Sequence, residues 1–324
     1  MSNLASNLHF SLGQIAPRPG PRHVTILLAT YNGAALLKPQ LTSFIGQTHD
    51  DWSLLVSDDG STDGTRTIIQ EFAKAHPSRR ITLIRGPERG SAQNFLSLLR
   101  AAGRAPFVAF ADQDDLWLKH KLSRAVFLIG REDRPTIYGS RTIIADQNLA
   151  PQRMSLLFKR PPSFRNALVQ NIAGGNTLVL NRAALERLQP ASRTAKRIVA
   201  HDWWSYQMVT GMGGSMIYDA TPGLLYRQHS KNQIGANDTV RAMAARMQRL
   251  VDGRFSSWLD AHFEALNGAR PWLTPDAIET LEACASLRSP SLIGRIRALR
   301  QSGICRQTCK GSAALILAAA CGRL

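Results

Sequence analysis

Short apolar runs alternate with amphipathic stretches through the first part of the chain. Residues 24–29 form a nearly unbroken apolar run, which predicts a strand buried on both faces. The stretch 34–47 places its apolar residues on one helical face. Because proline suits the first turn of a helix, we expect this helix to begin near Pro39. The same alternation predicts further strands at 52–57, 81–85 and 106–111, and further helices at 62–75 and 91–102.

Strands that alternate with helices of about a dozen residues predict the α/β class, with a Rossmann-like, doubly wound and mostly parallel sheet. Right-handed crossovers bring the carboxyl ends of such strands to one edge, where open sheets bind their ligands. The pattern is less regular further on, with strands expected at 176–180 and 215–220 and helices at 182–188 and 202–210. Beyond Asn237 the periodicity is helical throughout.

Three regions follow from this pattern. A chain of 324 residues accommodates one large α/β domain and an appendage. We expect a flexible leader at 1–22, the α/β domain at 23–236 and a helical C-terminal extension at 237–324. The leader lacks the basic start and continuous apolar run of a signal peptide. No apolar run in the sequence approaches the roughly 18 residues that a membrane-spanning helix needs.

The chain is strongly basic, with 40 Lys and Arg against 23 Asp and Glu, an excess that attracts nucleic acid, anionic lipid or nucleotide phosphate. The last forty residues carry seven basic side chains and no acidic one, interleaved with apolar residues at helical spacing. Such helices lie in the interface of an anionic membrane, so we expect peripheral membrane contact there. The alternative is an appendage packed on the α/β domain with its arginines solvated. A nucleic-acid reader more often spreads its basic surface over the folded domain, so no nucleic acid is expected.

An acidic cluster, DQDD at 112–115, follows the fourth expected strand. Carboxylates spaced i and i+2 at a strand exit can turn toward one point, and such hard oxygen ligands suit Mg²⁺ or Mn²⁺. A cation there would neutralise the charge that develops on a departing nucleotide diphosphate. The alternative is an acidic turn that caps a helix beginning near Trp117. A second cluster, DDGS at 58–61, could place a carboxylate against a pyrimidine base, or could be an ordinary turn.

Three motifs in this order carry a specific resemblance. TYN at 30–32, DDGSTDGT at 58–65 and DQDDLW at 112–117 each follow an expected strand. With this combination the chain resembles the inverting family 2 glycosyltransferases of the GT-A fold, over about residues 24–237. The stretches at 90–95 and 110–117 resemble the rhamnosyltransferase branch of that family in particular. No G-x-G-x-x-G loop follows the first strand, which disfavours a nicotinamide-binding domain.

The resemblance implies roles for individual residues. Asp58 would hold the base of the nucleotide, Asp114 would be the more direct of two metal ligands, and Asp115 would be a cap or a supporting group. Arg227 would neutralise phosphate through its forked donors. The residues implied at the donor nucleotide are Thr30, Asn32, Asp58, Asp59, Arg89, Asp112 and Arg227. The residues implied at a Mn²⁺ or Mg²⁺ ion are Asp112, Asp114 and His229.

Asp202 matches the position of the family's general base. Inversion in one step needs a carboxylate on the acceptor side, which takes the proton of the attacking hydroxyl. The family commonly has Glu-Asp here, and His201 stands in place of the glutamate. The alternative is that Asp202 caps a helix whose two tryptophans pack in the core. Residues 226–235 resemble a loop that closes over the donor, although a lone histidine such as His229 is more often structural.

The sequence thus predicts an inverting, metal-dependent glycosyltransferase in the cytoplasm, peripheral on the inner face of the plasma membrane. We expect dTDP-L-rhamnose as the first donor to test and a UDP-hexose as the next. The expected acceptor is a growing cell-surface polysaccharide or a lipid-linked oligosaccharide, which rests on family analogy. One alternative is a nonenzymatic basic module for nucleic acid or anionic lipid, which leaves the three motifs unused. Another is a nucleotidyltransferase, for which the chain lacks a Gly-rich, basic loop after the first strand.

Overall fold

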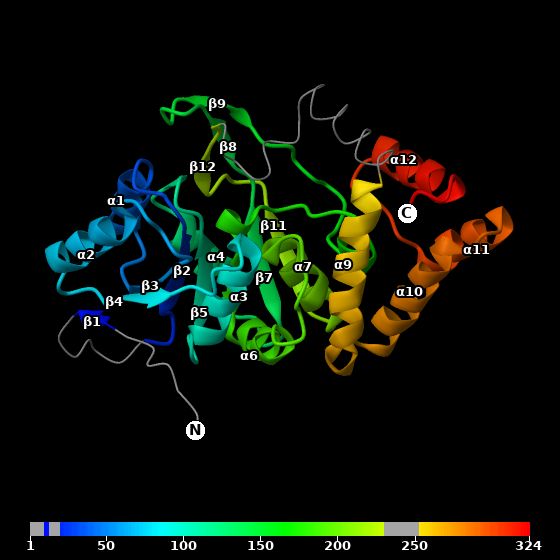
Figure 1. Cartoon of the computed structure of the whole chain (residues 1–324), viewed down its shortest axis with the longest axis horizontal. Helices are drawn as coiled ribbons and strands as arrows, with labels where there is room; N and C mark the ends of the chain where they lie inside the picture. The colour runs from blue at the N-terminus through cyan, green and yellow to red at the C-terminus, as the bar shows by residue number, and fades with distance from the viewer. Residues whose placement is uncertain (1–9, 13–19, 230–252) are drawn as a thin grey trace.

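The computed structural model describes residues 10–12, 20–229 and 253–324, and its centre is an eight-stranded sheet (Figure 1). The strand order is β1 (Phe10–Leu12), β4 (Ile81–Arg85), β3 (Trp52–Asp58), β2 (Val24–Thr30), β5 (Phe107–Ala111), β10 (Val179–Asn181), β7 (Thr136–Ser140) and β11 (Ser215–Asp219). β2 pairs in parallel with both β3 and β5, and β3 with β4. β10 is antiparallel to both of its neighbours. The expected α/β class with a mostly parallel sheet is therefore confirmed.

Helices cover both faces of this sheet. Ile26 and Leu28 of β2 join the core under α1 (Leu37–Ile45), α2 (Thr65–Ala75) and α4 (Lys121–Ile129). Leu27, which points the other way, joins the core under α3 (Ser91–Ala101), α6 (Arg182–Ala191) and α7 (His201–Gly211). Strands buried on both faces form continuous apolar runs in the sequence, which is why the strands in the first half of the chain could be predicted. The sheet is doubly wound, as predicted.

The strand order reverses between β2 and β5. β3 and β4 lie on one side of β2, while β5 and the later strands lie on the other. Chain segments that leave β2 and β5 therefore diverge, and open α/β sheets bind ligands in the crevice that opens at such a point. The motifs at 30–32 and 112–115 lie at the carboxyl ends of these two strands.

A second, four-stranded sheet was not predicted. Its order is β6 (Leu116–Trp117), β12 (Leu224–Arg227), β8 (Ile143–Ala145) and β9 (Pro151–Met154). The helix expected near Trp117 begins instead at Lys121, so the cluster at 112–115 precedes a strand and does not cap a helix. Likewise, the strand expected from residue 176 starts only at Val179, because residues 175–177 form a 3₁₀ turn.

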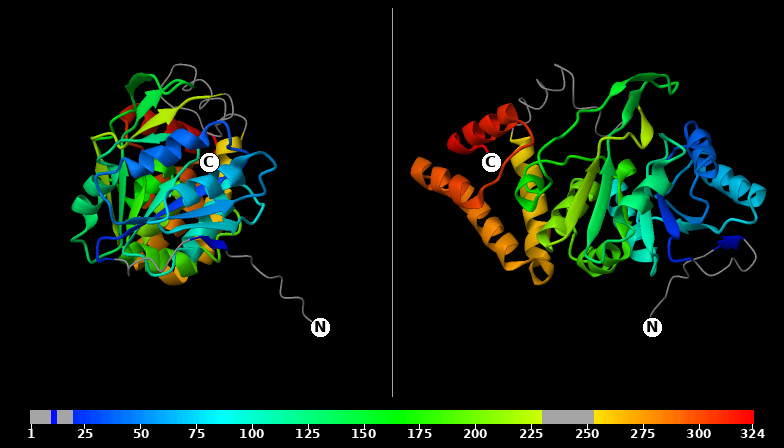
Figure 2. Two further views of the ribbon diagram at one scale, coloured as in Figure 1. Left: turned by 90° about the vertical axis from the view of Figure 1, so that its left-hand side faces the viewer. Right: turned by 180° about the vertical axis from the view of Figure 1, so that it is seen from behind.

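The C-terminal extension packs on the α/β core. It contains α9 (Arg254–Gly268), α10 (Pro275–Ala285), α11 (Leu292–Ser302) and α12 (Cys309–Ala320), at the end of the molecule opposite α1 and α2 (Figures 1 and 2). Leu259, Leu266, Leu281 and Leu315 join the same hydrophobic core as α3, α6 and α7. The described part of this region is helical, as expected. Within the described ranges, every helix falls short of the length and apolarity that a bilayer crossing requires.

The expected flexible leader is described only in part. Phe10–Leu12 pairs antiparallel with β4 at the edge of the large sheet. The rest of residues 1–19 lies outside the described residues, as do Asn232 and Gly235 of the loop expected to close over the donor.

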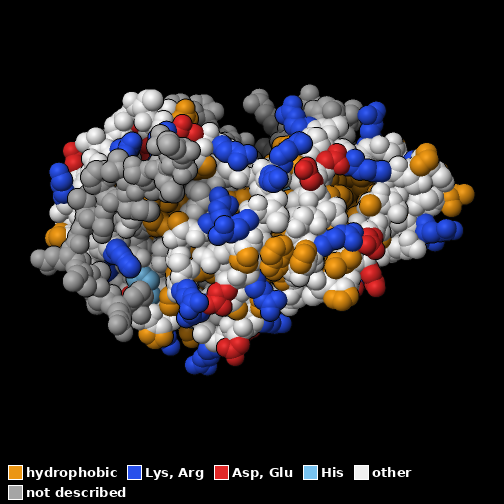
Figure 3. Space-filling view, turned by 60° about the horizontal axis from the view of Figure 1, so that its bottom comes forward, with side chains coloured by type: hydrophobic (Ala, Val, Ile, Leu, Met, Phe, Trp, Pro, Cys, Tyr) orange, Lys and Arg blue, Asp and Glu red, His pale blue; other side chains and the backbone are white. Residues whose placement is uncertain are grey.

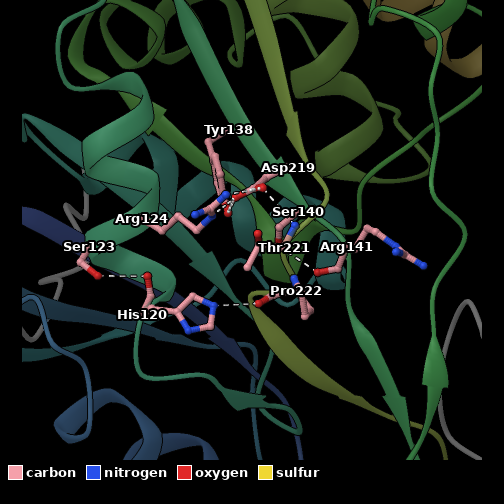
Figure 4. A network of polar contacts seen from close by, with 9 residues as sticks. All are labelled: His120, Ser123, Arg124, Tyr138, Ser140, Arg141, Asp219, Thr221 and Pro222. Atoms are coloured by element: carbon pink, nitrogen blue, oxygen red, sulfur yellow. Dashed lines mark hydrogen bonds and ion pairs between the residues drawn. The ribbon is translucent and has the colours of Figure 1, made fainter.

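A polar network around Asp219 ties the two sheets together (Figure 4). The Asp219 carboxylate pairs with the Arg124 guanidinium of α4 and accepts the Tyr138 hydroxyl at 3.0 Å and the Thr221 N–H at 3.0 Å. Burial alone raises the pKa of Asp219, but these hydrogen bonds outweigh it and hold the pKa below its ordinary value. The Arg141 N–H donates to the Asp219 carbonyl, and the Arg141 carbonyl accepts from Gly223. The network thus fixes where the chain leaves β11 and enters β12.

We expect Asp219→Asn to lower the free energy of unfolding by about 1–3 kcal/mol, because it weakens the charge-assisted hydrogen bonds that a buried carboxylate accepts. Urea unfolding followed by circular dichroism measures this. The matched control is Glu132→Gln, which breaks an exposed pair with Arg134 and should change stability by about 0–1 kcal/mol. Equal losses in the two variants would contradict a structural role for the network.

Candidate active site

A cavity of about 1170 Å³ opens at the carboxyl ends of β2 and β5. Seven of the residues singled out from the sequence line it, namely Thr30, Asn32, Asp59, Asp112, Asp114, Asp202 and His229. They come from segments up to 199 residues apart, counting from Thr30 to His229. Five of them lie at the carboxyl ends of β2, β3 and β5, which meet at one edge of the sheet. Asp202 begins α7, and His229 follows β12 of the second sheet. Asp58, Arg89 and Arg227 are not part of the lining.

Asp58 and Asp59 have different roles. The Asp58 carboxylate is buried and accepts the Thr30 hydroxyl at 3.1 Å, the Ser61 N–H at 3.0 Å and the Ser61 hydroxyl at 2.6 Å. The Asp59 carboxylate lines the cavity and accepts the N–H groups of Glu88 at 2.6 Å and of Gly90 at 2.9 Å. Asp58 therefore braces the end of β2, and Asp59 is the carboxylate at the cavity wall. Contact of Asp58 with a nucleotide base stays a prediction.

The loops after β2 and β5 are joined by a side chain. The Gln113 amide accepts the Tyr31 N–H at 2.9 Å and donates to the Tyr31 carbonyl at 3.0 Å. Asn32 has a φ of 45°, a left-handed conformation that asparagine tolerates better than most residues. Its N–H donates to Ser61 at 2.9 Å and its side-chain oxygen accepts the Thr62 N–H at 2.9 Å. The loops after β2, β3 and β5 are thus joined by hydrogen bonds.

Three carboxylates crowd the middle of the cavity. Burial, with smaller effects from the charges of Asp114 and Asp202, raises the pKa of Asp112 to about 8. The His229 imidazole lies across Asp114, with Nε2 at 2.8 Å from its Oδ2. Two carboxylates and an imidazole are oxygen and nitrogen donors that suit Mn²⁺ and Mg²⁺. The described residues contain no cluster of three or more His, Cys, Asp or Glu side chains arranged to hold a metal, so Asp112, Asp114 and His229 as ligands stay a prediction.

Asp115 supports the cluster from behind. It is fully buried and accepts the Asn176 amide at 2.5 Å and the Arg227 N–H at 3.1 Å. Burial raises the pKa of Asp115 well above its ordinary value. Lys121 is also fully buried, with its ammonium nitrogen 3.6 Å from the centre of the Trp117 ring, and burial lowers the pKa of Lys121 to about 7.

The two arginines expected at the phosphates lie outside the cavity wall. Arg89 is exposed in the loop before α3. Arg227 is buried in β12, and its guanidinium donates to the Gln147 carbonyl at 3.1 Å. The direction of a long side chain depends on the local backbone, which a motif does not specify. Contact of either arginine with a donor stays a prediction.

Asp202 lies in the first turn of α7 and lines the cavity. Its Oδ1 accepts the Trp203 N–H at 2.7 Å, and it also accepts from the Asn171 side chain and the Gly175 N–H. Burial raises the pKa of Asp202 despite these bonds. Trp203 and Trp204 are buried, as the alternative expected. The capping expected of Asp202 is not observed, because the N-cap of α7 is Ala200 and no side chain caps this helix. The carboxylate nevertheless faces the cavity.

His201 packs directly behind Asp202. Its ring stacks on Phe95 at 3.7 Å between centres and meets Phe110 edge-on at 4.9 Å. Burial lowers the pKa of His201 to about 3, so the imidazole is neutral at physiological pH. A residue that is commonly acidic in the resembling family is here an apolar support for the start of α7.

Comparison with known proteins bears on the family and the fold. The family model described as glycosyl transferase family 2 matches residues 25–188. A dTDP-rhamnosyl transferase of Shigella flexneri is 31% identical over 229 residues, covering 68% of this chain and 78% of that protein. A UDP-Glc:alpha-D-GlcNAc-diphosphoundecaprenol beta-1,3-glucosyltransferase of Escherichia coli is 31% identical over 170 residues, covering 50% of this chain and 61% of that protein.

Two solved structures share the fold. S. aureus TarS in complex with UDP-GlcNAc matches with a TM-score of 0.52 and 15% identity, over 86% of this chain and 89% of that one. A mannosyltransferase of Pyrobaculum calidifontis in complex with GDP-Man and Mn²⁺ matches with a TM-score of 0.51 and 22% identity, over 94% of this chain and 83% of that one. The likeness confirms the GT-A fold expected from the sequence.

We expect Gly175→Ala to disturb the start of α7. A Cβ at this position would lie 2.4 Å from His201 Nε2, and the stacked ring has no room to retreat, so overpacking should cost about 1–3 kcal/mol of stability. Urea unfolding and transfer activity should both decline. The control is Gly46→Ala, whose Cβ would meet nothing closer than 3.7 Å. An unchanged Gly175→Ala variant would show that His201 does not hold this helix start.

Proposed function

The chain belongs to glycosyl transferase family 2, and we propose that it transfers a sugar from a nucleotide-diphosphate donor to a glycan acceptor with inversion at the anomeric carbon. The observation that most directly supports this is the convergence of Asp112, Asp114 and Asp202 on one cavity at the switch point of the sheet. Asp112 and Asp114 would help to bind the donor, and Asp202 would act on the acceptor hydroxyl. Asp59 and Asn32, with Thr30, would form the nucleotide end of the cavity.

We propose that donor binding uses a divalent cation. The crowded carboxylates gain from a neighbouring positive charge, because burial and the charges of Asp114 and Asp202 raise the pKa of Asp112. Mg²⁺ and similar ions are commonly held by one or two carboxylates together with substrate phosphates and waters, and Asp112 and Asp114 fit that arrangement. When bound, the ion would neutralise charge on the departing diphosphate. The Pyrobaculum mannosyltransferase complex with Mn²⁺ supports this choice of ion.

Asp202 is the proposed general base. Its carboxylate lies in the cavity wall at the start of α7 and is held by the Trp203 N–H, so it is oriented before an acceptor arrives. It would take the proton of the attacking hydroxyl as the new glycosidic bond forms. A base acts only when unprotonated. Because burial raises the pKa of Asp202, activity should fall with decreasing pH at a higher pH than an exposed aspartate would give.

The relatives guide the choice of substrates. We propose dTDP-L-rhamnose as the first donor, since the Shigella flexneri relative is a dTDP-rhamnosyl transferase. A UDP-hexose is second, since the Escherichia coli relative uses UDP-Glc. That relative acts on a diphosphoundecaprenol-linked sugar, which supports a lipid-linked oligosaccharide or a growing cell-surface polysaccharide as acceptor. Such acceptors would place the protein in the cytoplasm, at the inner face of the plasma membrane.

The C-terminal helices offer a surface for peripheral membrane contact. Large apolar side chains are exposed on α11 and α12, among them Ile293 at 73% and Leu317 at 64%. Exposed basic residues on and beside the same two helices are Arg297, Arg300, Lys310 and Arg323. An apolar patch with a cationic surround fits the interface of an anionic membrane. The same helices also bury Ala298 and Leu315 in the core, so packing on the domain does not exclude contact with lipid.

A nonenzymatic basic module is the second candidate function, and the net charge alone favours it. On the face shown in Figure 3, the described Lys and Arg side chains lie in separate small groups, with Asp and Glu side chains beside several of them. A module that tracks a polyanion gathers its charge in a patch or stripe. A nonenzymatic basic module would also leave the carboxylates in the cavity without a role.

The donor site can be tested with a panel of nucleotide sugars, each with Mn²⁺ or Mg²⁺, read out by thermal stabilisation and by release of nucleoside diphosphate. We expect one donor to stabilise the wild type and Asp114→Asn to lose that response. Asp202→Asn should bind the donor but transfer about 10²–10⁴-fold more slowly, the range for loss of a general base.

The matched control is Asp133→Asn, an exposed aspartate outside the cavity, which should behave as the wild type. If no nucleotide sugar or nucleoside diphosphate binds with either ion, the glycosyltransferase proposal fails and the nonenzymatic basic module becomes the favoured function. Normal turnover in Asp202→Asn would remove Asp202 as the base.

We expect the double variant Ile293→Ser, Leu317→Ser to bind anionic lipid vesicles at least about tenfold more weakly than the wild type, because each apolar side chain is worth roughly 1.5–3 kcal/mol when buried. Vesicle sedimentation measures this. Point substitutions are preferred to deletion of α11 and α12, because deletion would expose the core residues that these helices cover. The control is Phe127→Ser, an 80% exposed aromatic residue on α4. Equal vesicle binding by the double variant and the wild type would refute membrane contact through these helices.

A further inference from the structure

Three side chains of the C-terminal extension line the same cavity as the carboxylates. Phe255 and Trp258 come from the first turns of α9, and Arg306 comes from the connection between α11 and α12. We call these three residues the C-terminal wall. All three are half-buried, and the guanidinium carbon of Arg306 lies 5.8 Å from the centre of the Phe255 ring.

The cavity has room for more than the donor. Its volume of about 1170 Å³ exceeds the roughly 300–1,000 Å³ typical of a pocket for a single small ligand. Its two ends also differ in chemistry. Asp59, Asp112 and Asp114 lie toward the ends of β2, β3 and β5, whereas the C-terminal wall is aromatic and cationic. One cavity with an acidic and an aromatic end fits two different substrates side by side.

Asp202 lies between these two ends. On one side its charge contributes to the raised pKa of Asp112. On the other side its helix packs against α9, where the ring of Trp203 lies 4.4 Å from the ring of His262. A base must face the hydroxyl that attacks, so the acceptor belongs on the α9 side of Asp202.

The start of α9 is held in a fixed position. His262, one turn after Trp258, is fully buried. Its Nε2 accepts the Val199 N–H at 3.3 Å, which leaves the proton on Nδ1 to donate to the Gln207 side chain at 2.8 Å. Gln207 belongs to α7, the helix that begins with the base. Trp258 and Asp202 are therefore carried by two helices that are bonded to one another.

The connection that carries Arg306 is held as firmly. The Arg306 N–H donates to Ser312 at 3.1 Å, and its carbonyl accepts from the Arg160 guanidinium at 2.9 Å. The next residue, Gln307, bonds the Arg160 backbone, Asn166 and Gln170. Since Gln170 itself lines the cavity, this wall is attached to the site and is not a loose appendage.

From this placement we propose that the C-terminal wall binds the acceptor as a glycosyl phosphate or diphosphate. This inference rests on the proposed function. Phe255 and Trp258 would pack against the apolar face of the acceptor sugar. The Arg306 guanidinium would pair with the phosphate oxygens that join this sugar to its carrier, through its planar, forked N–H groups. The sugar hydroxyl would then face Asp202, and the carrier would extend out of the cavity past Arg306.

The test uses the full chain with its donor site first filled by saturating dTDP or UDP and Mn²⁺, so that a diphosphate cannot bind there. Two probes are titrated by calorimetry, farnesyl-diphosphate-linked N-acetylglucosamine and the farnesyl glycoside of the same sugar without phosphate. We expect the wild type to bind the diphosphate probe at least tenfold more tightly than the glycoside. Arg306→Gln should remove that preference while leaving glycoside binding unchanged. Trp258→Ala should weaken both probes to a similar extent.

The matched control is Arg66→Gln, an exposed arginine on α2 outside the cavity, which should bind both probes as the wild type does. If the alanine variant melts at a lower temperature, Trp258→Phe is measured as well. Because it keeps an aromatic face, it should bind both probes more tightly than Trp258→Ala. Equal binding of the two probes by the wild type, absence of binding, or an undiminished preference in Arg306→Gln would each overturn the inference.

Failure of this inference is distinguishable from failure of the proposed function. The initial titration with dTDP or UDP and Mn²⁺ is made on every variant. If the wild type binds neither nucleotide, the glycosyltransferase proposal itself fails. If it binds a nucleotide but shows no preference between the probes, the donor site stands and only the role of the C-terminal wall is lost.

Discussion

Burial of neighbouring carboxylates in one cavity governs this site. Asp112, Asp114 and Asp202 line one cavity, and removal from water together with their mutual repulsion raises the pKa of Asp112. A nucleotide diphosphate would add further negative charge to the same space. The proposed cation would supply positive charge beside these carboxylates, since neither Arg89 nor Arg227 lines the cavity and Arg306 belongs to the C-terminal wall.

The carboxylates keep their positions because a second layer holds them. Asp115 joins the end of β5 to Asn176 and to the backbone of β12. Lys121 lies buried in the same region, over the ring of Trp117. A buried and hydrogen-bonded support of this kind fixes the geometry of the groups in front of it before any ligand arrives. The second sheet has the same effect, since it places His229 directly after β12.

The sequence predicted the parts of the fold whose signal is local. Strands β2, β3, β4 and β5 are buried on both faces and leave continuous apolar runs, so their positions agreed within one residue. The second sheet was missed because its strands have two to four residues, too few to show a period, and because their partners lie far away in the sequence.

The site was predictable to the extent that strand ends determine it. The motifs after β2, β3 and β5 had to meet, and they do. Which of Asp58 and Asp59 faces the cavity depends on one turn, and no motif encodes the direction of the Arg227 side chain. Phe255, Trp258 and Arg306 were not predicted at all, because only the packing of the C-terminal helices brings them to the cavity.

Gln113 acts as an additional peptide group. Its side-chain amide donates to and accepts from the backbone of Tyr31, and so joins the chain segments that leave β2 and β5 beyond the last strand residues. An amide can do this, whereas a carboxylate cannot donate and an ammonium cannot accept. A Cβ on Gly33 would collide with the Gln113 amide at 2.2 Å, so this glycine leaves the space that the amide occupies. The distance between the loop after β2 and the paired aspartates after β5 is thereby held by these two hydrogen bonds.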